Sequence, residues 1–359
     1  MIKVGSDFSG VGAFNQALMR LGIQYDEVFA CDMDKFARET FIHNYGEPKY
    51  YPKDVYEREI PKESLDIYMT SPPCQAFSLA GKRLGKDDKR GVLFFNSHEF
   101  IKKNKPRYFI FENVKGLLSD DNGNTFKEWI NMLGGKSVNG LPVLFAYEDS
   151  VPYHIYYKVM NAKKHGVPQN RERVFIIGIR DDADNHFRWA KEEHLTKRLK
   201  DVLDNYVDEK YSLSDKSVKR LCNNDSGFKS VPKNKEDIAS TVCASDYKIA
   251  RGMNILKVKS ATKKGYEEAA EGDSINFSVP NSETRRGRVG KGVAQTLDTQ
   301  CNQAVLQDQI RRLTPRECFR LMDFPDTFSW TCSDSQAYKQ AGNSIVVRCL
   351  ELIIKQFNL

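Results

Sequence analysis

Cys74 follows two prolines in the stretch TSPPCQAFSLAGK, residues 70–82. A thiolate is a strong nucleophile, and consecutive prolines stiffen a loop, so this sulfur could be held for attack on an electron-poor carbon. The apolar run 66–70 before it predicts a strand, and ligands of open α/β sheets bind at the carboxyl ends of strands. A single cysteine beside a proline turn is more often a buried structural residue. The catalytic interpretation therefore depends on which other groups reach the same edge.

An acid and two arginines are predicted at that edge. Glu112 and Asn113 end the apolar run 108–112, while Arg171 and Arg173 come just before the apolar run 174–179. A carboxyl group can share a proton with a substrate, and guanidinium groups can hold a carbonyl or phosphate and favour a nearby thiolate. These residues favour the nucleophile interpretation of Cys74.

A glycine-rich stretch predicts a cofactor site. DFSGVG, residues 7–12, lies between a predicted strand at 2–7 and a predicted helix at 14–21, where a ligand can approach the backbone at a helix N-terminus. Asp32 ends the next strand about twenty residues on, placed to accept ribose hydroxyls, and Asn15 replaces the third glycine of the dinucleotide pattern. This combination favours an adenosine ligand without a pyrophosphate.

The order of elements predicts an α/β fold with a doubly wound, mostly parallel sheet. Strands are expected at 2–7, 27–31, 66–70 and 108–112, helices at 14–21, 34–45 and 93–103, and antiparallel additions at 153–160 and 174–179. Apolar runs shorten after about residue 187. We therefore expect a catalytic and cofactor-binding domain at 1–186, a smaller irregular recognition domain at 187–310, and a segment at 311–359 whose helix at 345–357 returns to the first domain.

Composition and charge distribution indicate which kinds of partner, metal and cellular location to expect. The formal charge is +7, and residues 210–264 hold thirteen Lys and Arg against five Asp and Glu, so positive charge is concentrated there and an anionic partner is permitted. The eight cysteines show no zinc-site spacing, which favours an enzyme without a metal. Neither a secretory leader nor an apolar run long enough for a membrane span is seen, so a cytoplasmic protein is expected.

Several blocks, in their order along the chain, resemble the DNA cytosine-5 methyltransferase family of bacterial and phage restriction-modification type. The similarity covers nearly the whole chain, and the variable stretch falls at 187–310 as the family's target-recognition domain does. The matching blocks are DFSGVG (7–12), Asp32, Asp54, PPCQ (72–75), ENV (112–114), QNRER (169–173), RLTPRECFRLMDFP (312–325) and QAGNS (340–344).

The resemblance implies a fold of the S-adenosylmethionine-dependent methyltransferase type. It implies transfer of a methyl group from S-adenosylmethionine to carbon 5 of a cytosine flipped out of double-stranded DNA, leaving S-adenosylhomocysteine. Cys74 would attack carbon 6, Glu112 would hydrogen-bond the ring, and Arg173 with Arg171 would hold the ring carbonyl and the adjacent phosphate. The base that removes the carbon 5 proton is not identified.

The resemblance also implies a set of binding residues. Met33 departs from the aromatic residue that many relatives place over adenine. Expected cofactor contacts are Phe8, Gly10, Gly12, Asp32, Met33, Asp54, Pro73, Leu93, Asn343 and Ser344. The cationic loop 76–91 and the stretch 284–299 are expected to meet DNA. Expected DNA contacts are Ser78, Lys82, Arg83, Arg285, Arg286, Arg288, Lys291 and Thr296.

Two other functions stay open. A branch of the same family methylates transfer RNA with the same catalytic residues, although the long basic insert favours DNA. A catalytically silent DNA-binding protein could keep the fold, but the presence of Cys74, Glu112 and Arg173 argues against it. We expect a monomer acting on the nucleoid. The recognised DNA site, a companion restriction endonuclease and the bacterial or phage source stay open.

Overall fold

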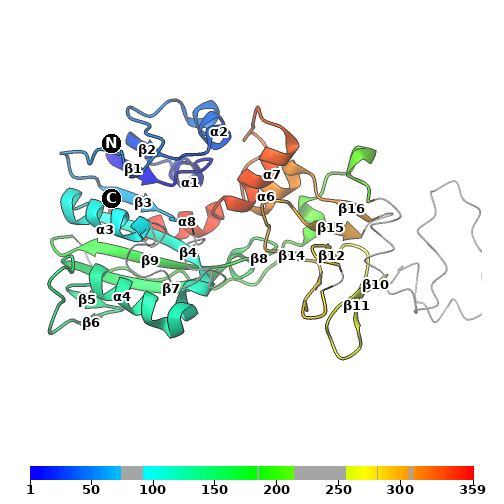
Figure 1. The fold of residues 1–359 in the computed structure, drawn as a ribbon. Helices are drawn as coiled ribbons and strands as arrows, with labels where there is room; N and C mark the ends of the chain where they lie inside the picture. The colour runs from blue at the N-terminus through cyan, green and yellow to red at the C-terminus, as the bar shows by residue number, and fades with distance from the viewer. Residues whose placement is uncertain (74–91, 184–185, 214–255, 281, 307–309) are drawn as a thin grey trace, which may run out of the picture.

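The computed structural model describes residues 1–73, 92–183, 186–213, 256–280, 282–306 and 310–359. An eight-stranded sheet forms the larger lobe, in the order β2-β1-β3-β4-β9-β7-β5-β6 (Figure 1). Four neighbouring strands are parallel: β2 (Tyr25–Cys31), β1 (Ile2–Asp7), β3 (Ile67–Thr70) and β4 (Tyr108–Val114). The other half is mixed: β9 (Glu172–Arg180) is antiparallel to β4 and β7 (Tyr153–Asn161), and β5 (Ser137–Val138) and β6 (Leu141–Pro142) form the edge.

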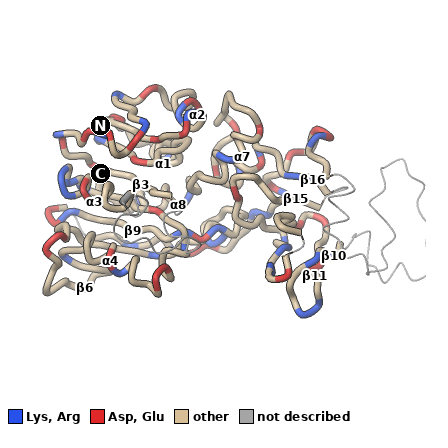
Figure 2. The backbone as a smooth tube through the Cα atoms, viewed as in Figure 1, with Lys and Arg blue, Asp and Glu red and all other residues tan. Residues whose placement is uncertain are grey.

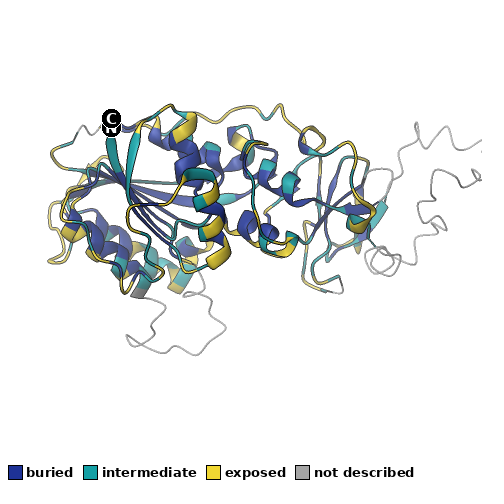
Figure 3. Cartoon of the chain, turned by 90° about the horizontal axis from the view of Figure 1, so that it is seen from above, coloured by how far each residue is buried: buried dark blue, intermediate teal, exposed yellow. Residues whose placement is uncertain are grey.

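Helices cover both faces of this sheet because its central strands are apolar on both faces. In β4, Tyr108 and Ile110 belong to one buried cluster, while Phe109 and Phe111 belong to another on the opposite face. The first cluster includes α1 (Ala13–Arg20) and part of α2 (Lys35–Tyr45). The second includes α3 (Val92–Asn104) and α4 (Asn124–Leu133). Figure 3 shows the buried strands between these helices, which confirms the doubly wound prediction.

The C-terminal segment packs against this lobe. Helix α8 (Val347–Ile354) packs beside α1, and Leu350 shares the first buried cluster with Leu18. The ring of Phe357 stacks on Tyr108 with 4.4 Å between centroids. The last residues therefore complete the core built by the first.

Short strands form a second group, which we call the recognition lobe, made of the described residues within 256–312. A hairpin joins β10 (Leu256–Lys259) and β11 (Tyr266–Ala269). A four-stranded sheet has the order β13 (Val289–Gly290), β12 (Ser274–Asn276), β15 (Gln303–Leu306) and β16 (Ile310–Arg312). Val258, Ile275 and Ala304 form its small core. One further pair, β14 (Ala294–Gln295) with β8 (Gln169–Asn170), links this lobe to the larger lobe, which holds the eight-stranded sheet.

The remaining helices lie between the two lobes or follow strands of the large sheet. Among them are α6 (Pro315–Leu321) and α7 (Asp334–Asn343), and four 3₁₀ helices, at Lys115–Gly123, Ala162–His165, Leu199–Val202 and Glu209–Tyr211. Within the part of the chain that the structure describes, no helix is long and apolar enough to cross a membrane.

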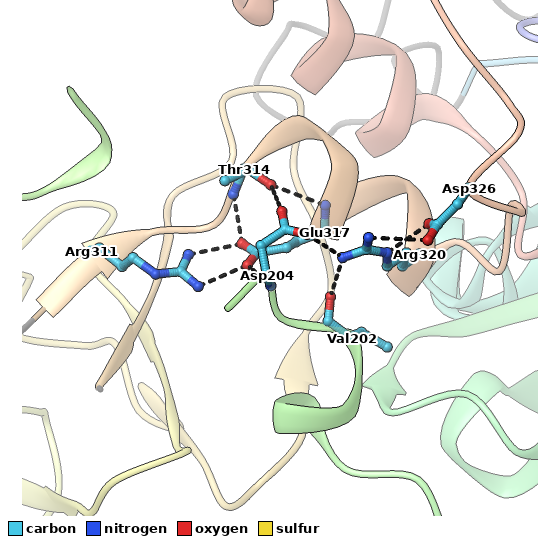
Figure 4. Close-up of polar contacts among 7 residues, drawn as sticks. All are labelled: Val202, Asp204, Arg311, Thr314, Glu317, Arg320 and Asp326. Carbon is cyan, nitrogen blue, oxygen red and sulfur yellow. Dashed lines mark hydrogen bonds and ion pairs between the residues drawn. The ribbon is translucent and has the colours of Figure 1, made fainter. Parts of the chain in front are cut away.

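A buried ion pair connects β16 to α6 at the RLTPRECF block (Figure 4). Glu317 accepts two hydrogen bonds from Arg311, at 2.7 and 2.8 Å, and one from the backbone N–H of Asp204 at 2.8 Å. Thr314 caps α6 and completes a capping box with Glu317. Arg320 binds Asp204 at 2.7 Å. Removing one partner of such a pair typically costs about 3–5 kcal/mol, so this block holds the junction together.

Candidate active site

The glycine-rich turn begins where β1 ends and is held by its neighbour β2. The N–H of Ser9 donates to the carbonyl of Cys31 at 3.0 Å, and that of Gly10 donates to Asp32 Oδ2 at 2.8 Å. The other oxygen of Asp32 accepts the N–H of Asp34 at 2.8 Å. Burial raises the pKa of Asp32, while the two N–H donors oppose that rise. Asp32 thus organises the turn, and its oxygens keep further lone pairs for a ligand.

The backbone of this turn is strained in a way that only its surroundings can maintain. Phe8 has φ of 58°, in the left-handed region that costs a side-chain-bearing residue roughly 1–2 kcal/mol. Gly12 has φ of 82°, and a Cβ there would lie 2.2 Å from a ring carbon of Tyr45. The turn therefore brings bare backbone to the sheet edge, as binding of a nucleoside-like cofactor requires.

Further predicted cofactor residues lie on adjoining segments. Asp54 is partly buried, and its Oδ1 accepts the N–H of Tyr56 at 2.9 Å. Leu93 on α3 packs with Phe8 against the second buried cluster. Asn343 is exposed at the end of α7, whereas Ser344 is buried. Met33, by contrast, is 80 % exposed, at the position where an apolar side chain is expected to stack on adenine.

Glu112 and Arg173 form an ion pair at the end of the neighbouring strands. Arg173 Nε lies 3.1 Å from Glu112 Oε1, because antiparallel pairing sets Val114 of β4 opposite Arg173 of β9. Burial raises the pKa of Glu112, although Arg173 and Arg171 oppose the rise. A carboxyl group in these surroundings holds a proton more readily than an exposed one and can donate it in a hydrogen bond.

Asn113 links this pair to the proline loop. Its Nδ2 donates to the carbonyl of Pro72 at 3.2 Å, and its own Oδ1 accepts the N–H of Val114 at 2.8 Å. Pro72 is buried and Pro73 is exposed. Sequence reasoning named Asn113 without giving it a role, and its place inside the ENV block was the available signal. Asn113 therefore anchors the residues that lead into position 74.

Four predicted site residues cannot be placed. Cys74, Ser78, Lys82 and Arg83 lie outside the described residues, together with the rest of the predicted DNA-closing loop at 76–91. What the structure does locate is the chain on both sides of them, from Pro73 backwards and from the start of α3 onwards.

Arg171 differs from the expectation that it holds the substrate. It is 3 % exposed and donates to the carbonyls of Leu297 at 3.1 Å, Gly342 at 2.9 Å and Ser344 at 2.8 Å. Burial, followed by the charge of Arg173, lowers its pKa. Because these carbonyls already engage its guanidinium, Arg171 is a structural clamp that positions the Asn343 and Ser344 segment.

The predicted DNA contacts separate into anchored and outward-facing residues. Arg288 is 1 % exposed and donates to the carbonyls of Asn276, Ser278 and Val279 at 2.7–3.1 Å, so the expected DNA contact is corrected to a buried anchor. Lys291 Nζ lies 2.8 Å from Asp273, which already neutralises its charge.

Three of the predicted contacts remain available to a partner. Arg286 is exposed and uses its Nε to hold the carbonyl of Ala261 at 3.0 Å, and Arg285 is half-buried beside it. Thr296 is exposed, with its hydroxyl donating to the carbonyl of Asn170 at 2.9 Å. Among the described residues, no group of three or more His, Cys, Asp and Glu side chains is arranged to hold a metal ion.

Comparisons with known proteins agree with this geometry. The family model described as C-5 cytosine-specific DNA methylase matches residues 2–358. The orphan methyltransferase M.SPRI of Bacillus phage SPR is 31 % identical over 449 residues, covering 99 % of this chain and 97 % of its own. The Type II methyltransferase M.HhaI of Haemophilus parahaemolyticus is 31 % identical over 349 residues, covering 96 % and 91 %.

A solved structure shows the same fold at lower identity. A mutant of the DNMT2 protein of Spodoptera frugiperda superposes with a TM-score of 0.64 at 18 % identity, and the match covers 99 % of each chain. The two-lobed arrangement is therefore shared over the full length and not confined to the large sheet.

Proposed function

The chain belongs to the C-5 cytosine-specific DNA methylase family and is a DNA cytosine-5 methyltransferase, and we propose that it acts on a cytosine flipped out of a specific double-stranded DNA site through a transient bond to Cys74. The observation that carries this proposal is the Glu112–Arg173 pair, which lies beside the anchored proline loop and on the same strand edge as the glycine-rich turn. A base can reach these groups only after leaving the helix.

Carbon 5 of cytosine is a weak nucleophile, so the reaction starts at carbon 6. The Cys74 thiolate forms a bond to carbon 6, and the displaced electron pair gives carbon 5 enamine character as ring nitrogen 3 gains hydrogen-bond donation from protonated Glu112. Carbon 5 then takes the methyl group, whose bond to the sulfonium sulfur would break to leave S-adenosylhomocysteine. A base removes the carbon 5 proton, and the electron pair from that C–H bond expels the cysteine sulfur, leaving 5-methylcytosine.

The two members of the Glu112–Arg173 pair have different proposed roles. Burial raises the pKa of Glu112, which favours sharing of a proton with the ring and opposes the build-up of charge on the ring during the attack. Arg173 orients Glu112 at 3.1 Å and is proposed to hold the ring carbonyl. Asn113 keeps the proline loop in register with both, so the attacking sulfur meets the ring at one position.

The cofactor residues fit an adenosine-bearing methyl donor. Bare backbone at Gly10 and Gly12 and the carboxyl groups of Asp32 and Asp54 suit a ribose and an amino acid moiety. S-adenosylmethionine supplies an electrophilic methyl group on a sulfonium. Phe8, Met33, Pro73, Leu93, Asn343 and Ser344 complete the proposed contact set.

Two surfaces are proposed to hold duplex DNA. The first is the cationic loop 76–91 with Ser78, Lys82 and Arg83, and the second is the recognition lobe with Arg285, Arg286 and Thr296, to which Lys291 adds its exposed stem. Phosphate contacts by these cations offset the few kcal/mol that base flipping costs.

One asymmetric base is modified at a time, so we propose a monomer acting on cytoplasmic DNA. Relatives named as orphan and as Type II enzymes both match, and a companion endonuclease is not part of the proposal.

Methyl transfer to competing nucleic acids tests the substrate. Purified protein, S-adenosylmethionine with a labelled methyl group, and either unmethylated duplex DNA or transfer RNA are incubated separately. We expect label in the DNA alone, released as 5-methylcytosine on hydrolysis and confined to one sequence by bisulfite mapping. Label in transfer RNA alone would replace the DNA assignment with the RNA one, and label in neither would overturn the enzymatic proposal.

A further inference from the structure

A buried ion pair lies at the start of the glycine-rich stretch, between its first residue, Asp7, and Arg58, to which no role was given above. Asp7 Oδ1 lies 3.0 Å from Arg58 Nε, and the two side chains are 0 % and 2 % exposed. The other oxygen of Asp7 accepts the hydroxyl of Tyr68 at 2.6 Å. Asp7 Oδ1 therefore meets the cation as an ion pair whose geometry is not that of a hydrogen bond, while Oδ2 accepts a hydrogen bond from a phenol.

Aromatic rings immobilise the cation. The guanidinium carbon of Arg58 lies 4.6 Å from the ring centroid of Phe100 on α3 and 5.8 Å from that of Phe29 on β2. Phe100 in turn stacks on Tyr68 at 4.1 Å. A planar guanidinium can stack on a ring while it binds a carboxylate, which an ammonium group cannot do in the same way. Arg58 consequently has one well-defined position.

This pair joins the two halves of the proposed cofactor site. Asp7 is the last residue of β1, and Phe8, with its left-handed backbone, follows at once. Arg58 comes four residues after Asp54, on the segment that packs against α3 and β2. Strained backbone persists only where its surroundings over-determine it. An ion pair with both partners immobilised is such a constraint.

We propose that Arg58 is a positioning residue for the cofactor, holding the turn at residues 8–12 and the Asp54 segment at a fixed separation through Asp7. The inference rests on the proposed function, because it assigns both segments to the cofactor site. Stability and positioning are separable here: a buried ion pair replaced by well-packed apolar side chains often leaves stability unchanged, while the directional constraint is lost.

The test uses the double variant Asp7→Leu/Arg58→Met in the full-length protein. Binding of S-adenosylmethionine and S-adenosylhomocysteine is measured by calorimetry, the melting temperature by circular dichroism, and kcat and both KM values by methyl transfer to DNA. We expect Kd for both nucleosides and KM for S-adenosylmethionine to rise by about tenfold or more, while kcat at saturation and KM for DNA stay within about twofold. Arg58→Lys should fall between wild type and the double variant.

Arg311→Met is the matched control, because Arg311 also forms a buried ion pair, with Glu317, at 5 % and 0 % exposure. It should lower the melting temperature and leave Kd for S-adenosylmethionine unchanged. Wild-type Kd values in the double variant would overturn the role of Arg58, as would an equal loss of affinity in Arg311→Met. Absence of S-adenosylmethionine binding by wild-type protein would instead contradict the proposed function together with this inference.

Discussion

Burial raises the pKa of both Glu112 and Glu27, but the two carboxyl groups have different neighbours and therefore different roles. Glu112 has Arg173 beside it, which allows the carboxyl group to act while it stays oriented. Glu27 on β2 accepts a hydrogen bond from Asn15 and is partnered by no cation among the described residues. Burial raises the pKa of Glu27 to about 8. Glu27 is therefore mostly protonated in the folded chain at neutral pH.

Glu27 predicts a pH dependence of stability with a definite sign. Its folded pKa lies above the ordinary value of 4.5, so the folded state holds a proton that the unfolded state releases between pH 4.5 and about 8. Its contribution to stability is complete below pH 4.5 and is lost as the pH rises through about 8. Relative to Glu27→Gln, the wild-type free energy of unfolding should fall by about 1 kcal/mol per pH unit in this window.

Urea denaturation of both proteins at several pH values from 4 to 9 measures this difference. Gln keeps the shape and can still accept from Asn15, so the two proteins should be equally stable near pH 4 and diverge above it, with Glu27→Gln the more stable at pH 8. A difference that does not change with pH would show that Glu27 ionises in the folded chain as it does in the unfolded one.

Arg171 and Arg173 have nearly the same sequence setting and different surroundings. Arg173 meets Glu112 at the strand edge, whereas Arg171 satisfies three carbonyls from segments far along the chain. Sequence reasoning assigned both to the substrate because a charge pattern says nothing of acceptors more than a hundred residues away. Arg288 was misassigned although its acceptors are near in sequence, because its charge pattern does not show that the chain folds back to place the carbonyls of residues 276, 278 and 279 around it.

At the scale of elements, the strands of the large sheet were predictable because they are continuous apolar runs that are buried on both faces. The predicted strand at 2–7 matches β1, and the predicted helix at 34–45 matches α2 with Asp34 as its N-cap. The strand predicted at 108–112 continues to Val114, since Glu112 and Asn113 keep pairing with β9 in spite of their polarity. Pairing with a neighbour, which sequence periodicity does not reveal, sets that boundary.

Other elements were missed. Helix α4 (Asn124–Leu133) was not predicted, because its start in DNGN reads as a turn and no side chain caps it. Its apolar residues Trp129, Ile130 and Leu133 do follow helical spacing, and they pack against the sheet. Strands β12 and β13 are three and two residues long, too short for alternation to appear, and they exist through pairing.

Over the whole molecule, the Arg311–Glu317 pair fixes β16 of the recognition lobe to α6, the helix that follows it. In the view of Figure 2, segments with Lys and Arg alternate with segments with Asp and Glu along the larger lobe. On the recognition lobe, Arg285 and Arg286 lie on the same loop as Arg288. The buried guanidinium of Arg288 donates hydrogen bonds to backbone carbonyls of that lobe and so fixes the loop. An anchored loop presents its outward cations with little loss of conformational entropy on binding.

The variant Arg285→Gln/Arg286→Gln should therefore weaken DNA binding. Loss of two phosphate contacts predicts that the slope of log K against log salt concentration decreases in magnitude by about two, while Kd for S-adenosylmethionine is unchanged. Fluorescence anisotropy at several salt concentrations measures the slope. Lys102→Gln/Lys103→Gln, on α3, removes the same charge from the larger lobe and should leave the slope unaltered. Equal slopes for both variants and wild type would remove the Arg285–Arg286 loop from the DNA interface.

Covalent capture of the attacking residue tests the proposed chemistry most directly. Duplex DNA in which 5-fluorocytosine replaces cytosine is incubated with the protein and S-adenosylmethionine, because fluorine on carbon 5 cannot leave as a proton does and the sulfur stays bonded to carbon 6. We expect a denaturation-resistant complex with wild-type protein, mapped by mass spectrometry to Cys74, and none with Cys74→Ala. A complex formed by Cys74→Ala, or one mapped to another residue, would contradict the assignment of the nucleophile.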